Sequence, residues 1–220
     1  MFWSRPTVSD DMAEWIAESF DWYEARFPTP DRLILPTAAF FSARKGAPQD
    51  TAAQVLADIQ RHLGNQMTLA LSPLGVVPAE YRHSYQSTGD VAGTFQSDGE
   101  TALITYDPEL LNRPISLINT LAHEVMHAQL HDVVDDFPGG IQAHELATDL
   151  SCIIAGFGVI QLQNADDLGW SGYLRQPTRA YALASFLHRR NIPLQNARPH
   201  LSARSWKLLK KAAKEQAAQA

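Results

Sequence analysis

The sequence contains a single cysteine, Cys152, among its 220 residues. An intramolecular disulfide is therefore excluded, which is typical of proteins in a reducing compartment. Cys152 lies in the apolar run DLSCIIAGFG, so we expect an inert, buried thiol. The N-terminal residues turn acidic early and include no long apolar stretch, so the sequence predicts neither a signal peptide nor a transmembrane span. We therefore expect a cytoplasmic protein.

Basic charge is also scarce. The 18 lysines and arginines are outnumbered by 24 aspartates and glutamates, and the formal net charge is −6. Nucleic-acid binders usually carry a basic patch, and anionic membrane surfaces attract polybasic segments, so neither partner is expected. The one strongly basic stretch, residues 207–214, is interleaved with alanines and indicates a solvated helix end.

What the sequence does contain is typical of a globular chain, with 45% hydrophobic and 19% charged residues. Hydrophobic periodicity predicts helices over residues 10–27, 50–63, 141–155, 178–190 and 201–217, and one that begins near Asn112-Arg113-Pro114. Asp50 is the expected cap of the second helix and Gly64 its end. The helix over 141–155 is expected to end at Gly156 or Gly158.

Short β-type runs cluster in one part of the chain, at residues 67–74, 93–96 and 100–106, with a turn at 97–99. Because helices flank this cluster and do not alternate with it, the sequence predicts an α+β fold with a small antiparallel or mixed sheet. We expect a single domain over residues 1–220. It would comprise an N-terminal helical part (1–65), a core (66–160) and C-terminal helices (161–220).

Residues 123–127 read HEVMH and match the H-E-x-x-H pattern. Positions i and i+4 share one face of a helix, so His123 and His127 can both reach a single metal ion. Glu124 is offset by about 100° around the helix, so it stands beside such an ion and not on it. There a glutamate can hold and deprotonate a zinc-activated water. The pattern therefore predicts a Zn²⁺ site with Glu124 as the base.

A third ligand is needed for such a site. His131 lies on the same face, but eight helical residues rise about 12 Å, too far for one ion to touch both His123 and His131. The segment QAHELATDLSC offers Glu145 as the third ligand and Asp149, one turn later, to accept the N–H of a metal-binding histidine. His144 is the rival ligand, although it points to a different face from Asp149.

The spacing of HEVMH and the Glu145–Asp149 pair resembles the gluzincin class of zinc metallopeptidases, in which two histidines and a downstream glutamate bind zinc. The order of helix, strands, HExxH helix and glutamate helix looks like the small minigluzincin core. The segments HELATDLSCIIAGFG and GYLRQPTRAYALASFL are similar to an uncharacterised bacterial group. The resemblance implies a zincin-like fold, zinc bound by His123, His127 and Glu145, and a bacterial origin. It also implies an oxyanion-stabilising side chain, for which Tyr173 in the loop GWSGYL is the candidate.

Three functional interpretations follow. The first is a zinc metallopeptidase acting on a peptide or protein, in which residues 100–106 form either an edge strand that pairs with the substrate or an interior strand. The second is a non-catalytic or latent zinc-binding scaffold, in which Trp15, Phe20 and Trp22 of the N-terminal helix cover the cleft or a partner. The third is a packed helix whose histidines bind no metal.

Overall fold

The structure is a computed structural model that describes residues 5–43, 48–75, 93–97, 101–168 and 172–219. By its internal contacts the chain divides into two compact units. One consists of residues 36–131, and the other combines residues 1–35 with 132–220. The boundaries of these units do not coincide with the boundaries of the three parts expected from the sequence. That residues 1–220 form a single domain stays a prediction.

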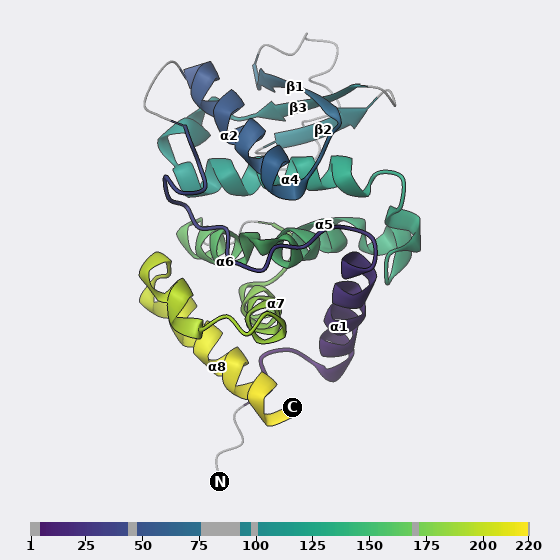
Figure 1. Cartoon of the computed structure of the whole chain (residues 1–220), viewed down its shortest axis with the longest axis vertical. Helices are drawn as coiled ribbons and strands as arrows, with labels where there is room; N and C mark the ends of the chain where they lie inside the picture. Colours follow the sequence, from purple (N-terminus) through teal and green to yellow (C-terminus); the bar gives the residue numbers. More distant parts are fainter. Residues whose placement is uncertain (1–4, 44–47, 76–92, 98–100, 169–171, 220) are drawn as a thin grey trace. The chain divides into compact units, whose positions relative to one another are not determined.

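The described residues within 36–131 form the α-helices and the small sheet of one unit (Figure 1). Its described elements are α2 (Pro48–Leu63), β1 (Thr68–Pro73), β2 (Gly93–Ser97), β3 (Thr101–Tyr106), the 3-10 helix η1 (Pro108–Asn112) and α4 (Pro114–Leu130). α4 packs against α2 and against the two antiparallel strands. Separate helices and a three-stranded sheet make an α+β architecture.

The sheet is mixed, with the order β1-β3-β2. β3 runs parallel to β1 and antiparallel to β2. It is therefore the central strand, so of the two expectations for residues 100–106 the interior strand is confirmed and the free edge is wrong. Ala102, Ile104 and Tyr106 are buried on one face of β3, as expected for a strand covered by a helix. The expected turn at 97–99 falls largely outside the described residues.

The α-helices α2 and α4 both begin at prolines. α4 begins at Pro114, as predicted, because the fixed φ of proline suits the first helical turn and its missing N–H is not needed there. α2 begins at Pro48, two residues before the expected cap. Asp50 therefore lies inside the first turn, where its charge complements the helix dipole, and the prediction that it caps the helix is wrong. Gly64, with φ of 66°, follows the end of α2 as predicted.

The other unit is helical in its described residues (Figure 1). Its helices are α1 (Asp10–Glu24), α5 (His144–Cys152), α6 (Gly158–Asp167), α7 (Gln176–Arg189) and α8 (Ala203–Gln219), with 3-10 helices η2 (Val134–Asp136), η3 (Gly140–Ala143) and η5 (Leu194–His200). α7 packs against α6 and α8, and α1 packs against α5. Cys152 is buried at the end of α5, as the sequence predicts.

The predicted end of the helix over 141–155 at Gly156 is confirmed. The helical run continues from α5 into η4 (Ile153–Phe157) as far as Gly156, whose φ of 96° is not helical, and α6, which the sequence did not predict, begins directly after this kink. Gly156 makes the bend with φ of 96°, and its carbonyl accepts a 3.0 Å hydrogen bond from the N–H of Ile34. A glycine is needed there because a Cβ would lie 2.8 Å from Cγ of Pro30.

The aromatic residues of α1 pack within their own unit. Trp15 donates a 2.6 Å hydrogen bond to the Pro138 carbonyl, and the Trp22 ring lies 4.8 Å from the Phe137 ring. Phe20 is fully buried. These side chains therefore stabilise the helical unit. The sequence alone could not distinguish this role from covering a cleft.

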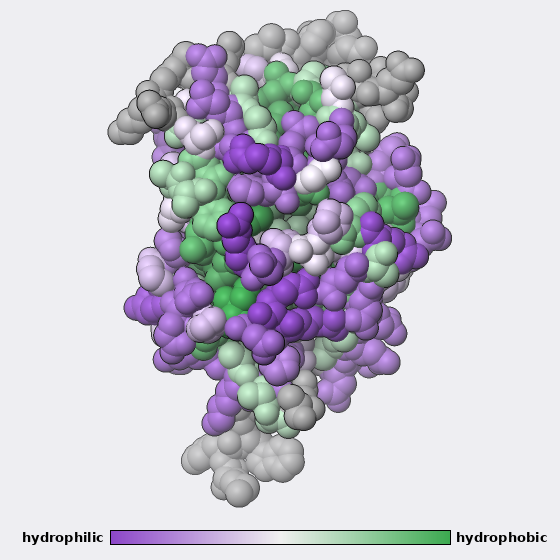
Figure 2. Space-filling view, viewed as in Figure 1, coloured by the Kyte–Doolittle hydropathy of each residue, from purple (hydrophilic) through white to green (hydrophobic). Residues whose placement is uncertain are grey.

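One helical run among the described residues, Gly140–Asp167, is long and apolar enough by composition to cross a membrane. Of its most apolar window, 89% is buried inside the structure, as in the core helix of a soluble protein. Figure 2 shows hydrophilic residues over much of the face in view, interspersed with smaller hydrophobic areas. The few large hydrophobic side chains exposed among the described residues are Ile141, Leu168 and Tyr173.

Candidate metal centre

α4 brings the two predicted histidine ligands together. The Nε2 atoms of His123 and His127 lie 2.9 Å apart, and the rings meet edge-on at 86°. His127 is buried and His123 is half-buried. One full turn of a regular helix separates them, so the pairing follows from the i, i+4 spacing and from the packing of α4 against the sheet.

The spacing of these two nitrogens suits a shared metal ion. With Zn–N bonds of about 2.0–2.1 Å and tetrahedral angles, two nitrogens on one zinc lie roughly 3.3 Å apart. The observed 2.9 Å needs only a small rotation of the rings to reach that value. The imidazoles of His123 and His127 therefore fit two positions of a zinc coordination sphere.

Glu124 is the charged residue next to the histidine pair on α4. Only 6% of its surface is exposed, which is unusual for a carboxylate. Burying a charge in a helix that packs on a sheet costs free energy unless the charge is compensated, so such positions often serve chemistry. The predicted base is thus both adjacent to the histidines and shielded from bulk water.

The remaining predicted residues belong to the other unit. Glu145 lies in the first turn of α5, and Asp149 follows one turn later on the same face. By residue type, His123, His127 and Glu145 are three side chains that could hold a metal ion. The rival ligand, His144, is the first residue of α5 and does not belong to that group. His131 follows the last residue of α4 and is exposed.

Asp149 has a buried environment that sequence reasoning missed. Its Oδ2 atom accepts hydrogen bonds from the N–H groups of Tyr173 and Leu174, at 2.8 and 3.0 Å, and from Nη2 of Arg179, at 2.9 Å. Both partners of the ion pair are buried, with side-chain exposures of 0% for Arg179 and 2% for Asp149. The signal in the sequence is a lone arginine within the apolar run TRAYALASFL of α7.

The same contacts place Tyr173, the candidate for oxyanion stabilisation. Asp149 holds its backbone N–H, while 57% of the residue is exposed. The structure thus anchors the backbone at residues 173 and 174, and the role of the phenol stays a prediction.

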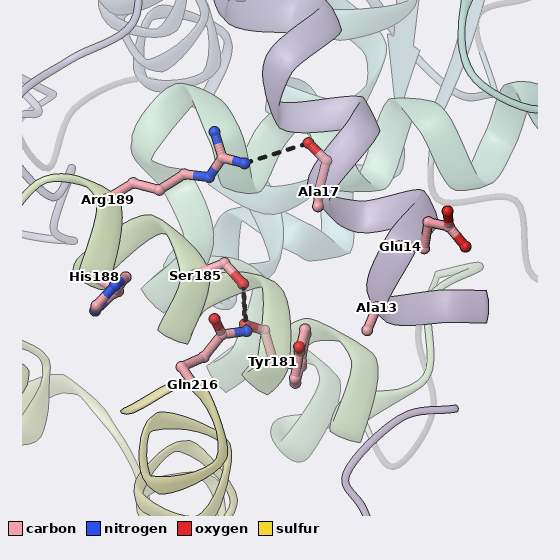
Figure 3. A pocket seen from close by; sticks show the side chains of 8 residues that line it. All are labelled: Ala13, Glu14, Ala17, Tyr181, Ser185, His188, Arg189 and Gln216. Carbon is pink, nitrogen blue, oxygen red and sulfur yellow. Dashed lines mark hydrogen bonds between the residues drawn. The ribbon is translucent and has the colours of Figure 1, made fainter. Parts of the chain in front are cut away.

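A concave surface lies in the helical unit, between α1, α7 and α8 (Figure 3). It encloses about 430 Å³ and includes Ser185 and Tyr181. The Ser185 hydroxyl donates a hydrogen bond to the Tyr181 carbonyl. It accepts one from the side-chain N–H of Gln216, drawn as a dashed line in Figure 3. The proton of the Ser185 hydroxyl is thus bound by a backbone carbonyl of its own helix, α7.

Two imidazoles and a downstream glutamate are side chains that could hold a metal ion, and a buried glutamate follows the first histidine. No family model, curated protein or solved structure matches the chain. The chemical interpretation therefore depends on the residues themselves.

Proposed function

We propose that this protein is a zinc-dependent metallopeptidase with a zincin-like fold and a gluzincin-type ligand set. The observation that carries the proposal is the 2.9 Å approach of the His123 and His127 Nε2 atoms, on the helix that also carries the buried Glu124. A structural zinc site is closed by four protein ligands and holds no water that needs a base, so it has no use for a glutamate at that position.

In this proposal His123, His127 and Glu145 hold the zinc. A set of two histidines and one glutamate leaves a coordination position open for water or substrate, which distinguishes catalytic from structural zinc sites. Zinc supplies a Lewis acid there and makes water a nucleophile at neutral pH. Support comes from the histidine geometry and from the occurrence of these three residues as a group that could hold a metal.

Side chains of this protein would then transfer protons and donate or accept hydrogen bonds. Glu124 accepts a proton from the attacking water and passes it to the amine that leaves when the peptide bond breaks. Its burial excludes competing water and strengthens its interaction with the developing charge. Asp149 would accept the N–H of a metal-binding histidine and fix its tautomer. Tyr173 remains the candidate donor to the oxyanion.

Glu124→Gln tests the catalytic part of the proposal, since glutamine keeps the shape of the side chain but cannot accept the proton. We expect hydrolysis of a fluorogenic peptide library to fall by about 10²–10⁴-fold, as for the loss of a general base. Bound zinc should stay unchanged, because Glu124 is not a ligand. Full activity in the variant would exclude Glu124 as the base.

The same experiment distinguishes a second candidate function from the metallopeptidase. A wild-type protein that binds zinc but hydrolyses no peptide in the library would be a non-catalytic or latent zinc-binding scaffold. The high exposure of Tyr173 is the observation that favours this alternative, because a donor that faces bulk water stabilises an oxyanion less than one in a site that excludes water.

A further inference from the structure

Arg179 is a fully buried arginine that no catalytic step above requires. Its guanidinium makes hydrogen bonds in three directions, and each goes to a different part of the helical unit. Nη2 binds Asp149 of α5 at 2.9 Å, Nη1 binds the backbone carbonyl of Gln161 in α6 at 3.0 Å, and Nε binds the Leu174 carbonyl at 2.9 Å. One side chain of α7 thus connects α5, α6 and the loop before α7.

These contacts span the bend in the helix. Asp149 precedes the π-helical turn that contains Gly156, and Gln161 follows it. Because the chain kinks at Gly156, whose φ of 96° is not helical, the hydrogen bonds of one continuous helix do not fix the angle between α5 and α6. The rigid fork of a guanidinium that bonds both sides of the bend supplies that constraint.

The buried pair is not an efficient source of stability. Replacing a buried ion pair by apolar residues is often neutral or stabilising, so its presence calls for another explanation. Gln161 adds to the cost, since its Oε1 accepts from Arg179 while its buried Nε2 has no partner among the described residues. We therefore expect this network of buried polar side chains to hold another part of the structure in position.

We propose that Arg179 is a positioning residue of the metal centre. It fixes the rotation of α5, and with it the direction of Glu145 one turn before Asp149, and it anchors the backbone of Tyr173 through the shared Asp149 carboxylate. This inference rests on the proposed function, because the orientation of Glu145 matters only if Glu145 binds the metal.

Gly172 gives an independent way to disturb this network without removing a charge. It has φ of 86°, and a Cβ built there would overlap Nη2 of Arg179 and lie 2.9 Å from Oδ2 of Asp149. Gly140 is a matched control in the same unit. It also has positive φ, 60°, but the nearest atom to its Cβ would be the Asp135 carbonyl oxygen at 3.8 Å, an ordinary contact.

The test compares full-length wild type with Arg179→Lys, Gly172→Ala and Gly140→Ala. Lysine keeps the charge but cannot bond Asp149 and Gln161 together. Two quantities are measured: backbone amide exchange at residues 173 and 174 in zinc-free protein, and the zinc dissociation constant by chelator competition. Gly172→Ala keeps Arg179 itself, so it carries the test if Arg179→Lys does not fold.

We expect both network variants to exchange at least tenfold faster at residues 173–174 and to bind zinc about 10–100-fold more weakly, as when a ligand loses its supporting contacts. The Gly140→Ala control should change each quantity by less than about twofold. Faster exchange with unchanged zinc affinity would overturn the inference and make Arg179 purely structural, as would unchanged exchange. A wild type that binds no zinc would instead refute the proposed function, and the inference with it.

Discussion

Gly156→Ala tests the account of how the helical unit is built at its bend. The new Cβ would meet Cγ of Pro30 at 2.8 Å, the Arg32 carbonyl oxygen at 3.3 Å and Cδ1 of Ile34 at 3.4 Å. Two of these are stiff, a proline ring and a backbone oxygen, so the segment from 30 to 34 must move. The variant should therefore destabilise the contact between that segment and the bend.

The magnitude follows from three contributions. A non-glycine residue at positive φ costs about 1–2 kcal/mol, and overpacking a filled space costs about 1–3 kcal/mol. Alanine recovers about 0.4–1 kcal/mol by restricting the unfolded chain. The net loss in the free energy of unfolding is therefore roughly 2–4 kcal/mol, a large part of the about 5–15 kcal/mol typical of a folded protein.

Urea unfolding followed by circular dichroism measures this loss. With a slope of about 2 kcal/mol per molar urea, the midpoint should fall by roughly 1–2 M. Gly140→Ala serves as the control, because it introduces the same positive-φ strain without the overlap and should lose at most about 1 kcal/mol. A Gly156→Ala protein that loses less than about 0.5 kcal/mol, or no more than the control, would refute the assignment of the bend to close packing at Gly156.

Two further predictions concern buried groups. Burial alone would raise the pKa of Asp58, but hydrogen bonds from Ser42 and the Arg61 guanidinium lower it overall. A folded-state pKa below the unfolded value of about 3.9 stabilises the protein above about pH 4, and this contribution is lost as the pH falls through the folded pKa. The stability difference between wild type and Asp58→Asn, measured by urea unfolding from pH 7 to pH 3, should therefore shrink at low pH, and a constant difference would contradict the assignment. Cys152, fully buried, should react with a thiol reagent only after unfolding, so rapid labelling of the native protein would show that the core around it opens.

The sequence was sufficient where the local signal and the packing agree. Pro114 begins α4 and Gly64 follows α2, because the backbone preferences of proline and glycine act within a few residues. The pairing of His123 with His127 follows in the same way from helix geometry, and the structure confirms that their Nε2 atoms meet. The α+β class could likewise be predicted from the clustering of the strands.

The features that the sequence did not determine depend on contacts between residues that lie far apart in the chain. Gly156 ends a helix as expected, but the start of α6 directly after the kink was not predicted, and the kink packs against residues 30–34, which are more than a hundred positions away in the chain. The central position of β3 depends on the order of strands in space, which chain order does not reveal. Arg179 is buried because its partners, Asp149 and Gln161, are 30 and 18 residues away, so no local pattern marks it.

The central claim is that this chain binds zinc through His123, His127 and Glu145. Elemental analysis of the purified protein, after equilibration with zinc and removal of excess metal, tests it most directly in wild type, His127→Ala and Glu145→Ala. The account predicts about one zinc per wild-type chain and loss or clear weakening of binding in both variants. A wild-type protein that retains no zinc after it has been added back would contradict the account and leave α4 as a packed helix whose histidines serve the core.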